Sequence, residues 1–260
     1  MTALRWASGE KTVADFAVPS FGTDVPPSDS FSVTENGKYT VYAADSAGLS
    51  AVQTIEVSNI ITLAPTITLD YSPKTAVSTG VAISASASVS NSASGNTLNA
   101  LRWASGEKTT ADFAVPTFGT DVPPSGSFSV TANGKYTVYA ADSAGLSAVQ
   151  TIEVSNIITL APTITLDYSP KTAVSTGVAI SASASVSNSA SGNTLNALRW
   201  ASGERTAADF AVPAFGTDVP PSGSFNITEN GMYTVYAADS SGLSAVQTIE
   251  ITNIVTQAPT

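Results

Sequence analysis

The sequence predicts an all-β fold, built as tandem antiparallel β-sandwich domains of about seven strands each. Three observations support this. The chain repeats itself every 97 residues. Within each repeat, apolar residues alternate with polar ones at a period of two, and turn residues separate the alternating segments roughly every 8–12 residues. A repeat of this length has the size of one independently folding domain rather than of a solenoid unit.

The repeat divides the chain unevenly. The run Ala-Leu-Arg-Trp-Ala-Ser-Gly-Glu begins at Ala3, Ala100 and Ala197, and residues 64–99 are identical to residues 161–196. The later part of the repeat is therefore present three times and the earlier part twice. The domains we expect are residues 1–62, an incomplete repeat with strands C to G only, residues 63–159, a complete repeat, and residues 160–260, a complete repeat and the most divergent copy.

Because the chain begins in mid-repeat, we expect it to be part of a longer array. The short Pro-bearing joint at 62–65 suits a domain boundary, so we expect strands A and B of residues 64–99 to complete the copy that follows them. Residues 2–61 would then lack these two strands, and we expect this piece to be poorly ordered alone and readily cut by proteases.

The strands of the middle repeat follow from the alternation. In chain order it predicts strand A around Ile67 and Leu69, strand B over 81–89, strand C around Leu101 and Trp103, strand E around Phe128 and Val130, strand F over 136–140 and strand G over 147–157. Residues 91–99 are a Ser- and Asn-rich loop. Prolines confine residues 110–126 to an edge strand or an irregular loop. Asn133-Gly134 predicts a tight turn between strands E and F.

Two aromatic positions favour an immunoglobulin-like sandwich. Trp103 lies on strand C, where such domains often bury a large aromatic side chain. Tyr39 stands two residues before the inward-facing Val41, as in a tyrosine corner, in which the hydroxyl donates back to the upstream backbone. We expect six residues of this kind in the structural core: Trp6, Trp103, Trp200, Tyr39, Tyr136 and Tyr233.

The runs at residues 128–142 and 150–157 resemble the bacterial Ig-like repeats of Gram-positive surface proteins. The resemblance covers essentially the whole chain. It implies export to the bacterial cell surface or the extracellular space and a spacer or adhesin role. The segment after Met1 has no basic region followed by an apolar one, so an export signal would lie outside these residues. Leu146 departs from the pattern, because such repeats often carry Asn there.

The composition excludes several functions. The chain has no Cys and no His, so disulfides, thiolate chemistry and Ser-His-Asp catalysis are impossible within it. Its formal net charge of −10 gives no electrostatic basis for binding nucleic acid or anionic lipid. No apolar run approaches the roughly 18 residues of a membrane span. We therefore expect no enzyme, no catalytic residue, no nucleic-acid partner and no membrane insertion.

Five acidic residues are candidate calcium ligands. Asp45, Asp142 and Asp239 begin the turn between strands F and G, and Asp70 and Asp167 lie near strand A. The alternative is an Asx turn, in which the carboxylate accepts hydrogen bonds from nearby backbone N–H groups. No Asp-x-Asp-x-Asp run supplies the six or more oxygens that Ca²⁺ prefers. We expect no cofactor and no metal, with calcium as the alternative.

Exposed aromatic residues offer a possible carbohydrate-stacking face. The candidates are Trp103, Trp200, Tyr139 and Tyr236. Trp103 alternates like a core residue, and Tyr139 has the phase of a cross-strand packing partner, so we favour packing over sugar binding.

Two polar pairs offer covalent or hydrolytic chemistry. Lys74 and Asn156 lie near the first and last strands of one repeat, as in an isopeptide bond, but Lys74 follows a polar turn instead of lying in the apolar site that this chemistry needs. Glu107 and Asp112 are acids around one loop, where solvation is the simpler expectation.

The function we expect is that of a non-catalytic spacer or stalk of a bacterial cell-surface or secreted protein, such as an adhesin. One alternative is a glycan- or protein-binding Ig-like module. Another is a strand-exchanging filament or surface-layer subunit, whose incomplete first repeat accepts donated strands. The expected partners are neighbouring repeats of the same chain and host or cell-wall glycans or proteins.

Overall fold

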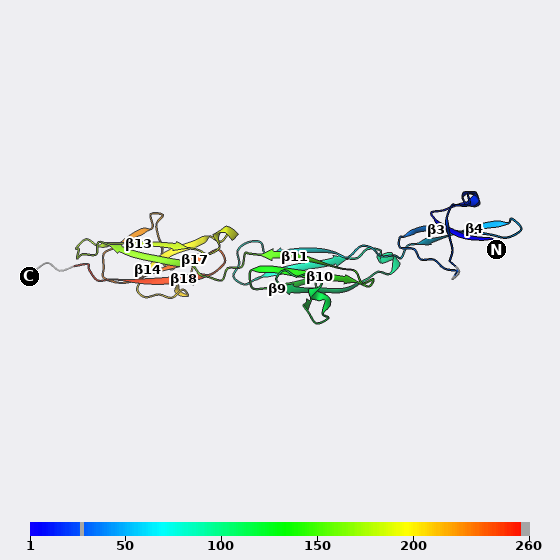
Figure 1. The fold of residues 1–260 in the computed structure, drawn as a ribbon. Helices are drawn as coiled ribbons and strands as arrows, with labels where there is room; N and C mark the ends of the chain where they lie inside the picture. Colours follow the sequence, from blue (N-terminus) through cyan, green and yellow to red (C-terminus); the bar gives the residue numbers. More distant parts are fainter. Residues whose placement is uncertain (27–28, 256–260) are drawn as a thin grey trace, which may run out of the picture.

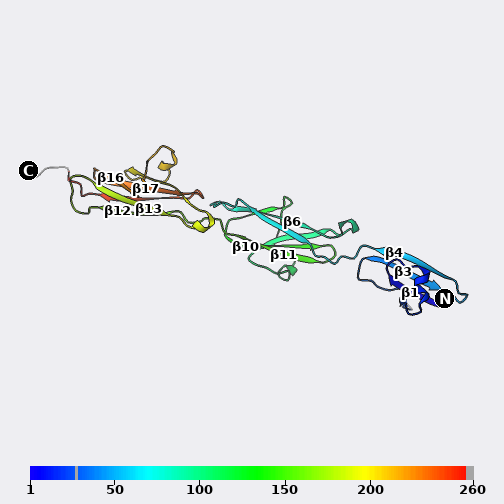
Figure 2. The same cartoon turned by 90° about the horizontal axis from the view of Figure 1, so that it is seen from above.

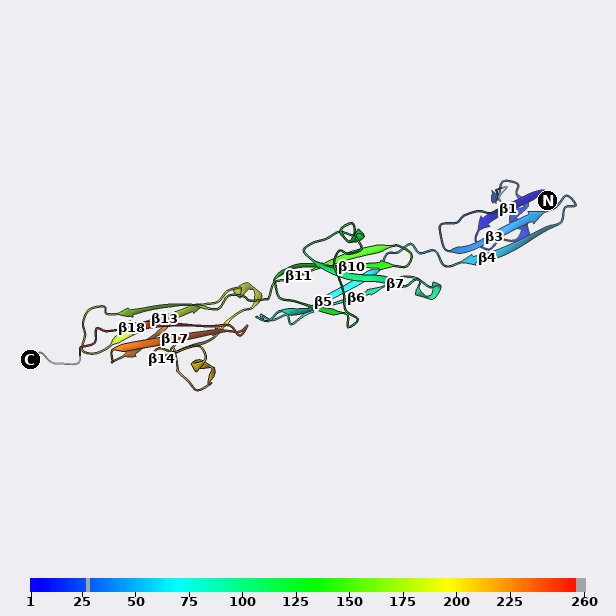
Figure 3. The same cartoon turned by 90° about the horizontal axis from the view of Figure 1, so that it is seen from below.

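The structure is a computed structural model that describes residues 1–26 and 29–255. Three bodies lie end to end, with the two termini at opposite ends (Figure 1). Figures 2 and 3 show the same line of bodies from above and below. We call the bodies unit 1 (residues 1–62), unit 2 (63–159) and unit 3 (160–255). Residues 27–28 and 256–260, which fall in the first and last expected domains, lie outside the described residues.

Unit 2 is a sandwich of two antiparallel sheets. One has the strand order β5-β6-β9 and the other β11-β10-β7-β8. The strands are β5 (Thr66–Ser72), β6 (Val81–Ser88), β7 (Leu98–Ser105), β8 (Thr120–Asp121), β9 (Ser127–Val130), β10 (Gly134–Asp142) and β11 (Ser147–Val154), and the 3₁₀ turns are η2 (Ser92–Ser94) and η3 (Asp112–Ala114). This is the order A-B-E against G-F-C with a short fourth strand. The fold is immunoglobulin-like, which confirms the predicted class.

Unit 3 repeats this topology, with sheets β12-β13-β16 and β15-β14-β17-β18. Its strands are β12 (Thr163–Ser169), β13 (Val178–Ser185), β14 (Leu195–Ser202), β15 (Thr217–Asp218), β16 (Ser224–Ile227), β17 (Gly231–Asp239) and β18 (Ser244–Ile251), and its 3₁₀ turns are η4 (Ser189–Ser191) and η5 (Asp209–Ala211).

The described residues of unit 1 form one sheet, of order β2-β1-β3-β4. Its elements are β1 (Ala3–Ser8), η1 (Val13–Ala17), β2 (Thr23–Asp24), β3 (Gly37–Ala44) and β4 (Ser50–Val57). Residues 31–33, which correspond to part of β9, form no strand. In unit 2 this segment pairs with β6, and β6 has no counterpart among the described residues of unit 1.

Period-two alternation explains both the strands and the core. Val81, Ile83 and Ala85 of β6 are at most 3% exposed, while Ala82 and Ser84 between them face solvent. The residues that face them from β10, Val138 and Ala140, are fully buried. Because successive side chains of a strand point to opposite faces, each sheet contributes one apolar face, and the two faces close on each other.

Strand G ends earlier than predicted. We expected it to run to residue 157, but β11 ends at Val154. Beyond that point the chain crosses to the other sheet, where Val77 and Ile157 form a parallel bridge. The Val77 N–H donates to the Asn156 carbonyl at 3.0 Å. This pairing buries Ile157, which is 1% exposed.

The segment between β7 and β9 folds back over the outer face of its sheet. We predicted an edge strand or an irregular loop, and β8 is indeed a two-residue edge strand. However, Phe113 within this loop is 1% exposed. Its ring stacks on Tyr139 at 4.9 Å and meets the edge of Phe118 at 5.1 Å. Each complete unit thus has a second, small apolar cluster outside the sandwich, which the sequence pattern did not predict.

Candidate functional site

Hydrogen bonds join unit 2 to unit 3. The Ser191 hydroxyl, at the end of η4, donates to the Ser155 carbonyl of unit 2 at 2.9 Å. The Ser78 hydroxyl of unit 2 donates to the Ser241 carbonyl of unit 3, also at 2.9 Å. Loops at the facing ends of two sandwiches therefore contact each other directly, besides being linked through the chain.

The joint between units 1 and 2 uses the same repeat positions. The Ser94 hydroxyl donates to the Ser58 carbonyl at 3.0 Å, as Ser191 does to Ser155 one repeat later. The Asn91 side chain donates to the Ile60 carbonyl at 3.3 Å. The serine contact therefore recurs at both joints, in keeping with the repeated sequence.

The loops at this end of each complete unit are held by one buried carboxylate. Asp142 is 2% exposed. Its Oδ1 accepts from the N–H groups of Ala144 and Leu146, and its Oδ2 accepts from the Asn96 side chain at 3.0 Å. Burial by itself would raise the pKa of Asp142, but hydrogen bonds from Asn96 and from the turn backbone outweigh it and lower the pKa. Asp239 makes the equivalent contacts: it accepts from the N–H groups of Ser241 and Leu243 and from the Asn193 side chain.

The other candidate calcium ligands lie in different surroundings. Asp45 of unit 1 is exposed and accepts from two N–H groups of its own turn. Asp70 and Asp167 form 2.7 Å ion pairs with Lys74 and Lys171. Within residues 1–26 and 29–255, no three acidic side chains gather where they could hold a metal ion. The geometry at all three F–G turns is that of an Asx turn.

The three tryptophans are partly exposed, and Trp103 and Trp200 pack against the cores of units 2 and 3. We predicted Trp6, Trp103 and Trp200 as core residues, but all three are only half-buried. Trp103 stacks on Phe128 at 4.2 Å with the rings 8° apart, where the edges of the two sheets meet. A ring in this position packs against the core on one face and meets solvent at its rim, which explains its partial burial.

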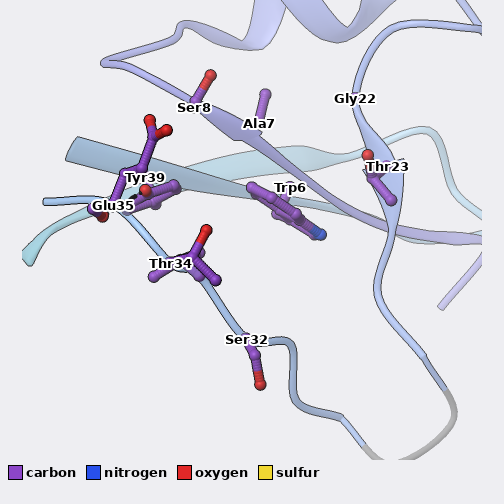
Figure 4. Close-up of a pocket in the computed structure, with 10 residues that line it drawn as sticks. Trp6, Ala7, Ser8, Gly22, Thr23, Ser32, Thr34, Glu35 and Tyr39 are labelled. Atoms are coloured by element: carbon purple, nitrogen blue, oxygen red, sulfur yellow. Dashed lines mark hydrogen bonds between the residues drawn. The ribbon is translucent and has the colours of Figure 1, made fainter. Parts of the chain in front are cut away.

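A groove runs beside Trp6 in unit 1 (Figure 4). Its volume is about 480 Å³, and the smaller hollow beside Trp200 in unit 3 measures about 250 Å³. Serine and threonine side chains and Glu35 line the groove around the Trp6 and Tyr39 rings. One face of the Trp6 indole is already stacked on Phe31 at 4.4 Å. The groove therefore offers hydroxyls and one acid, but no pair of carboxylates for hydrolysis.

The three corner tyrosines are buried, being 6–7% exposed. Their hydroxyls donate to carbonyls four residues upstream: Tyr39 to Glu35 at 2.6 Å, Tyr136 to Ala132 at 2.6 Å and Tyr233 to Glu229 at 2.8 Å. Burial raises the pKa of Tyr136. Each hydroxyl fixes the bend between strands E and F to the strand that follows.

A second lock at this bend was missed from the sequence. The Asn133 side chain donates to the Ile157 carbonyl at 2.7 Å and accepts from the Ile157 N–H at 2.9 Å. We had assigned Asn133-Gly134 to a tight turn on the basis of turn preference alone. The bond to a residue 24 positions away could not be predicted without knowing that the chain beyond β11 passes there.

Tyr139 and Tyr236, which point away from the sandwich core, each have a phenylalanine ring stacked on them. Phe113 stacks on Tyr139, and the Arg102 guanidinium lies 5.3 Å from the same ring. Arg102 also donates to the Pro116 and Phe118 carbonyls, which ties the loop down. One face of Trp103 is thus occupied by Phe128 and one face of Tyr139 by Phe113, so neither ring has both faces open for sugar stacking.

The polar pairs each have other partners. Lys74 lies 3.4 Å from the Tyr71 ring centre and pairs with Asp70. Asn156 donates to the Pro73 and Thr75 carbonyls. The structure therefore places Lys74 in an exposed ion pair, which is unlike the apolar site that an isopeptide bond requires.

The two acids of the loop are also separately engaged. Glu107 pairs with Lys135 at 2.6 Å, and this hydrogen bond lowers the pKa of Glu107. Asp112 accepts from the backbone and hydroxyl of Thr109, which lowers the pKa of Asp112 as well. Both stay ionised at neutral pH, so neither is a proton donor of the kind that glycoside hydrolysis needs.

Among the described residues, no helix has the length and apolar character needed to cross a membrane.

No protein-family model matches the sequence, and no curated protein matches it. Among solved structures, eight N-terminal Ig domains of Down Syndrome Cell Adhesion Molecule are 16% identical, with a TM-score of 0.40 over 96% of this chain and 37% of that one. Immunoglobulin domains 1–5 of Sidekick-1 are 15% identical, with a TM-score of 0.34 over 96% and 54%. The human Desmocollin-1 ectodomain is 10% identical, with a TM-score of 0.31 over 99% and 52%.

This chain thus spans less than two thirds of the length of each of these structures. At such TM-scores the similarities carry no argument of their own. The fold assignment therefore depends on the strand order within each unit.

Proposed function

We propose that the chain is a non-catalytic spacer, a stretch of tandem sandwiches that sets the distance between what is attached at its two ends. The end-to-end arrangement in Figures 1 to 3 is the observation that carries this proposal. Repeated hydrogen bonds at the joints, from Ser94 and from Ser191, support it. Near-identical units suit a spacer, because length depends on copy number and no single unit needs a pocket of its own.

The proposed setting is the surface of a bacterial cell or a secreted adhesin. The sequence resemblance to Ig-like repeats of Gram-positive surface proteins supports this setting. An antibody against the repeat should label intact cells of the source organism as strongly as lysed cells. Labelling that requires lysis would contradict a surface location.

Binding of glycans or proteins is less well supported than the spacer role. The aromatic rings best suited to sugar stacking are already stacked on Phe31, Phe128 and Phe225. The partners we propose are therefore the neighbouring units of the same chain.

Small-angle X-ray scattering on the full chain tests the spacer role. Three units in line, with eight-residue strands of about 3.4 Å per residue plus turns, give a rod of roughly 110 Å. The radius of gyration of such a rod is about 30 Å, whereas a compact globule of this length has one of about 18 Å. A value near 18 Å would contradict the spacer, because the units would then fold back on one another.

A further inference from the structure

The chain leaves unit 2 through a short segment that is bonded to two other parts of the unit. We call residues 156–158, which follow β11, the exit segment. It forms a parallel bridge with Val77: the Val77 N–H donates to the Asn156 carbonyl at 3.0 Å, and the Ile158 N–H donates to the Val77 carbonyl at 2.8 Å. Ile157 and Ile158 are each 1% exposed. The exit segment is therefore part of the folded unit and not a loose linker.

Two asparagine side chains add further bonds to the exit segment. The Asn156 side chain donates to the Pro73 carbonyl at 2.9 Å and to the Thr75 carbonyl at 2.6 Å, which ties the segment to the chain that follows β5. Asn133, at the bend between β9 and β10, donates to the Ile157 carbonyl at 2.7 Å and accepts from the Ile157 N–H at 2.9 Å. Because Asn156 is only 3% exposed, water competes little for its bonds.

Unit 3 repeats this arrangement. Val174 and Ile254 form the parallel bridge. Asn253 donates to two carbonyls of the segment that follows β12. Asn230 binds both the N–H and the carbonyl of Ile254. The contact is thus a property of each complete unit.

The first and last strands of unit 2 run in the same direction along the rod. Thr66, at the start of β5, pairs with Ser88 at the end of β6. The loop after β6 contacts unit 1 through Ser94, and its Asn96 binds Asp142 just before β11. Both β5 and β11 therefore begin at the end that faces unit 1 and run toward unit 3. In Figure 1 the strands of units 2 and 3 lie along the line of the three bodies.

Tension on the rod would load the exit segment in shear. A pull from unit 1 acts on the start of β5, and a pull from unit 3 acts on the exit segment, in the opposite direction. The two segments would have to slide past each other before the unit could open. The hydrogen bonds between them lie across the direction of pull, so they are strained together and must break together. Bonds at the end of a peeled strand would instead break one after another.

The cost of burying Asn156 also favours a load-bearing role. Its Oδ1 is buried and accepts no hydrogen bond from the described residues. An unpaired buried acceptor lowers the equilibrium stability of a fold, and an apolar side chain in this place would avoid that cost. Asn253 has the same unpaired oxygen in unit 3. The two asparagines therefore supply cross-links at a cost to folding stability.

We propose that each complete unit carries tension along the rod, with the exit segment and its two asparagines as the contact that resists unfolding under load. These asparagines are Asn133 and Asn156 in unit 2 and Asn230 and Asn253 in unit 3. The tension-bearing role rests on the spacer role, since tension reaches a unit only through what is attached at the two ends. The two roles fail separately: an extended rod whose units resist load no better without the asparagines remains a spacer.

The test holds the full chain by its two termini at constant load and records stepwise unfolding. Each complete unit should lengthen the chain by roughly 300 Å, since an extended residue spans at most about 3.5 Å. The variant carries Asn133→Ala and Asn156→Ala, while unit 3 keeps its own asparagines as an internal reference. In the unchanged chain the two long steps should have similar lifetimes. In the variant the lifetime of one step should fall about tenfold or more, because four hydrogen bonds are lost.

Two control variants separate resistance to load from ordinary stability. Asn99→Ala changes an exposed asparagine of β7 and should leave both lifetimes unchanged. Val138→Ala removes two methyl groups from a fully buried side chain of β10, and it should lower the midpoint of urea unfolding. Its lifetime under load should fall much less than that of the asparagine variant. If Val138→Ala shortens the lifetime as much for an equal fall in urea midpoint, the asparagines only stabilise the fold and the proposal is wrong.

Single variants keep the test decisive if the double variant leaves unit 2 unfolded. A unit that is unfolded before the load is applied gives no long step, so its absence identifies that case. Asn133→Ala and Asn156→Ala are then tested separately, and each should shorten the lifetime of one step about threefold or more. Two long steps of equal lifetime in both single variants would overturn the proposal.

Discussion

Both oxygens of one carboxylate hold the end of each complete unit in shape. In unit 3, Asp239 accepts from the backbone of its own turn and from the Asn193 side chain. Asn193 is 1% exposed and also donates to the Ser187 carbonyl. The carboxylate therefore fixes the loop that carries Ser191, the residue that contacts unit 2. A side chain considered as a metal ligand from sequence is instead part of the support of the joint.

This arrangement predicts sensitivity to acid. Although burial opposes it, hydrogen bonding lowers the pKa of Asp142 and of Asp239, so folding favours their charged forms. Their contribution is complete above about pH 4, the ordinary pKa of Asp in an unfolded chain, and is lost as the pH falls through the lower folded value. The midpoint of urea unfolding should therefore decline in acid, and it should decline less steeply in a chain carrying Asp142→Asn and Asp239→Asn.

The two chains differ only at Asp142 and Asp239, so the difference in how steeply their unfolding midpoints fall with pH isolates the buried pair. A matched control carries Asp24→Asn and Asp121→Asn, two exposed positions on β2 and β8. The urea midpoint of this control should fall with decreasing pH as steeply as that of the unchanged chain. If the urea midpoint of the Asp142→Asn, Asp239→Asn variant also falls as steeply as that of the unchanged chain, the role assigned to Asp142 and Asp239 is contradicted.

Individual strands could be predicted because each one has its own alternation. β6 shows this most clearly, with serine on one face and apolar residues on the other. The loop between β7 and β8 could not be predicted in the same way. Its prolines indicate irregular structure, but the burial of Phe113 depends on where the loop lies, and that depends on Arg102 of β7 and Tyr139 of β10. Trp103 packs against the core but is only half-buried, because alternation gives the face of a sheet and not the distance from its edge.

The apolar cluster of Phe113, Phe118 and Tyr139 lies outside the sandwich, so its loss should release one loop without unfolding the unit. Phe113→Ala removes a fully buried ring, a change that typically costs about 3–5 kcal/mol in a core. Because Phe113 lies outside the sandwich, the loss should detach the loop and leave Val138 and the core intact. Trypsin should cut after Lys108 much faster than in the unchanged chain, as measured by fragment mass.

Val115→Ala is the matched control, since Val115 lies in the same loop but is 57% exposed. Its cleavage rate should match that of the unchanged chain. Faster hydrogen exchange throughout β10 in the Phe113 variant would show that the cluster supports the whole unit, contrary to this prediction.

At the scale of the molecule, the joints decide whether the sandwiches act as one rod. The second joint has two hydrogen bonds across it, from Ser191 to Ser155 and from Ser78 to Ser241. The first joint has the counterpart of Ser191, which is Ser94, but the described residues of unit 1 have no hairpin to contribute a counterpart of Ser78. The sequence shows the repeat and therefore that joints recur. It cannot show which loops meet, because that depends on the angle between neighbouring units.

Loss of both contacts should loosen the second joint. Ser78→Ala with Ser191→Ala removes two hydrogen bonds that together contribute about 1–2 kcal/mol. The chain has no Cys, so Ser86→Cys and Ser183→Cys, on exposed positions of β6 and β13, give two unique spin-label sites on units 2 and 3. The distance distribution between the labels should be narrow in the unchanged background and clearly broader in the double variant. Ser84→Ala with Ser181→Ala, exposed strand positions away from the joint, should leave it narrow. A distribution that is already broad with both contacts present would mean that the hydrogen bonds do not hold the units in line, and the rod would then depend on the linker alone.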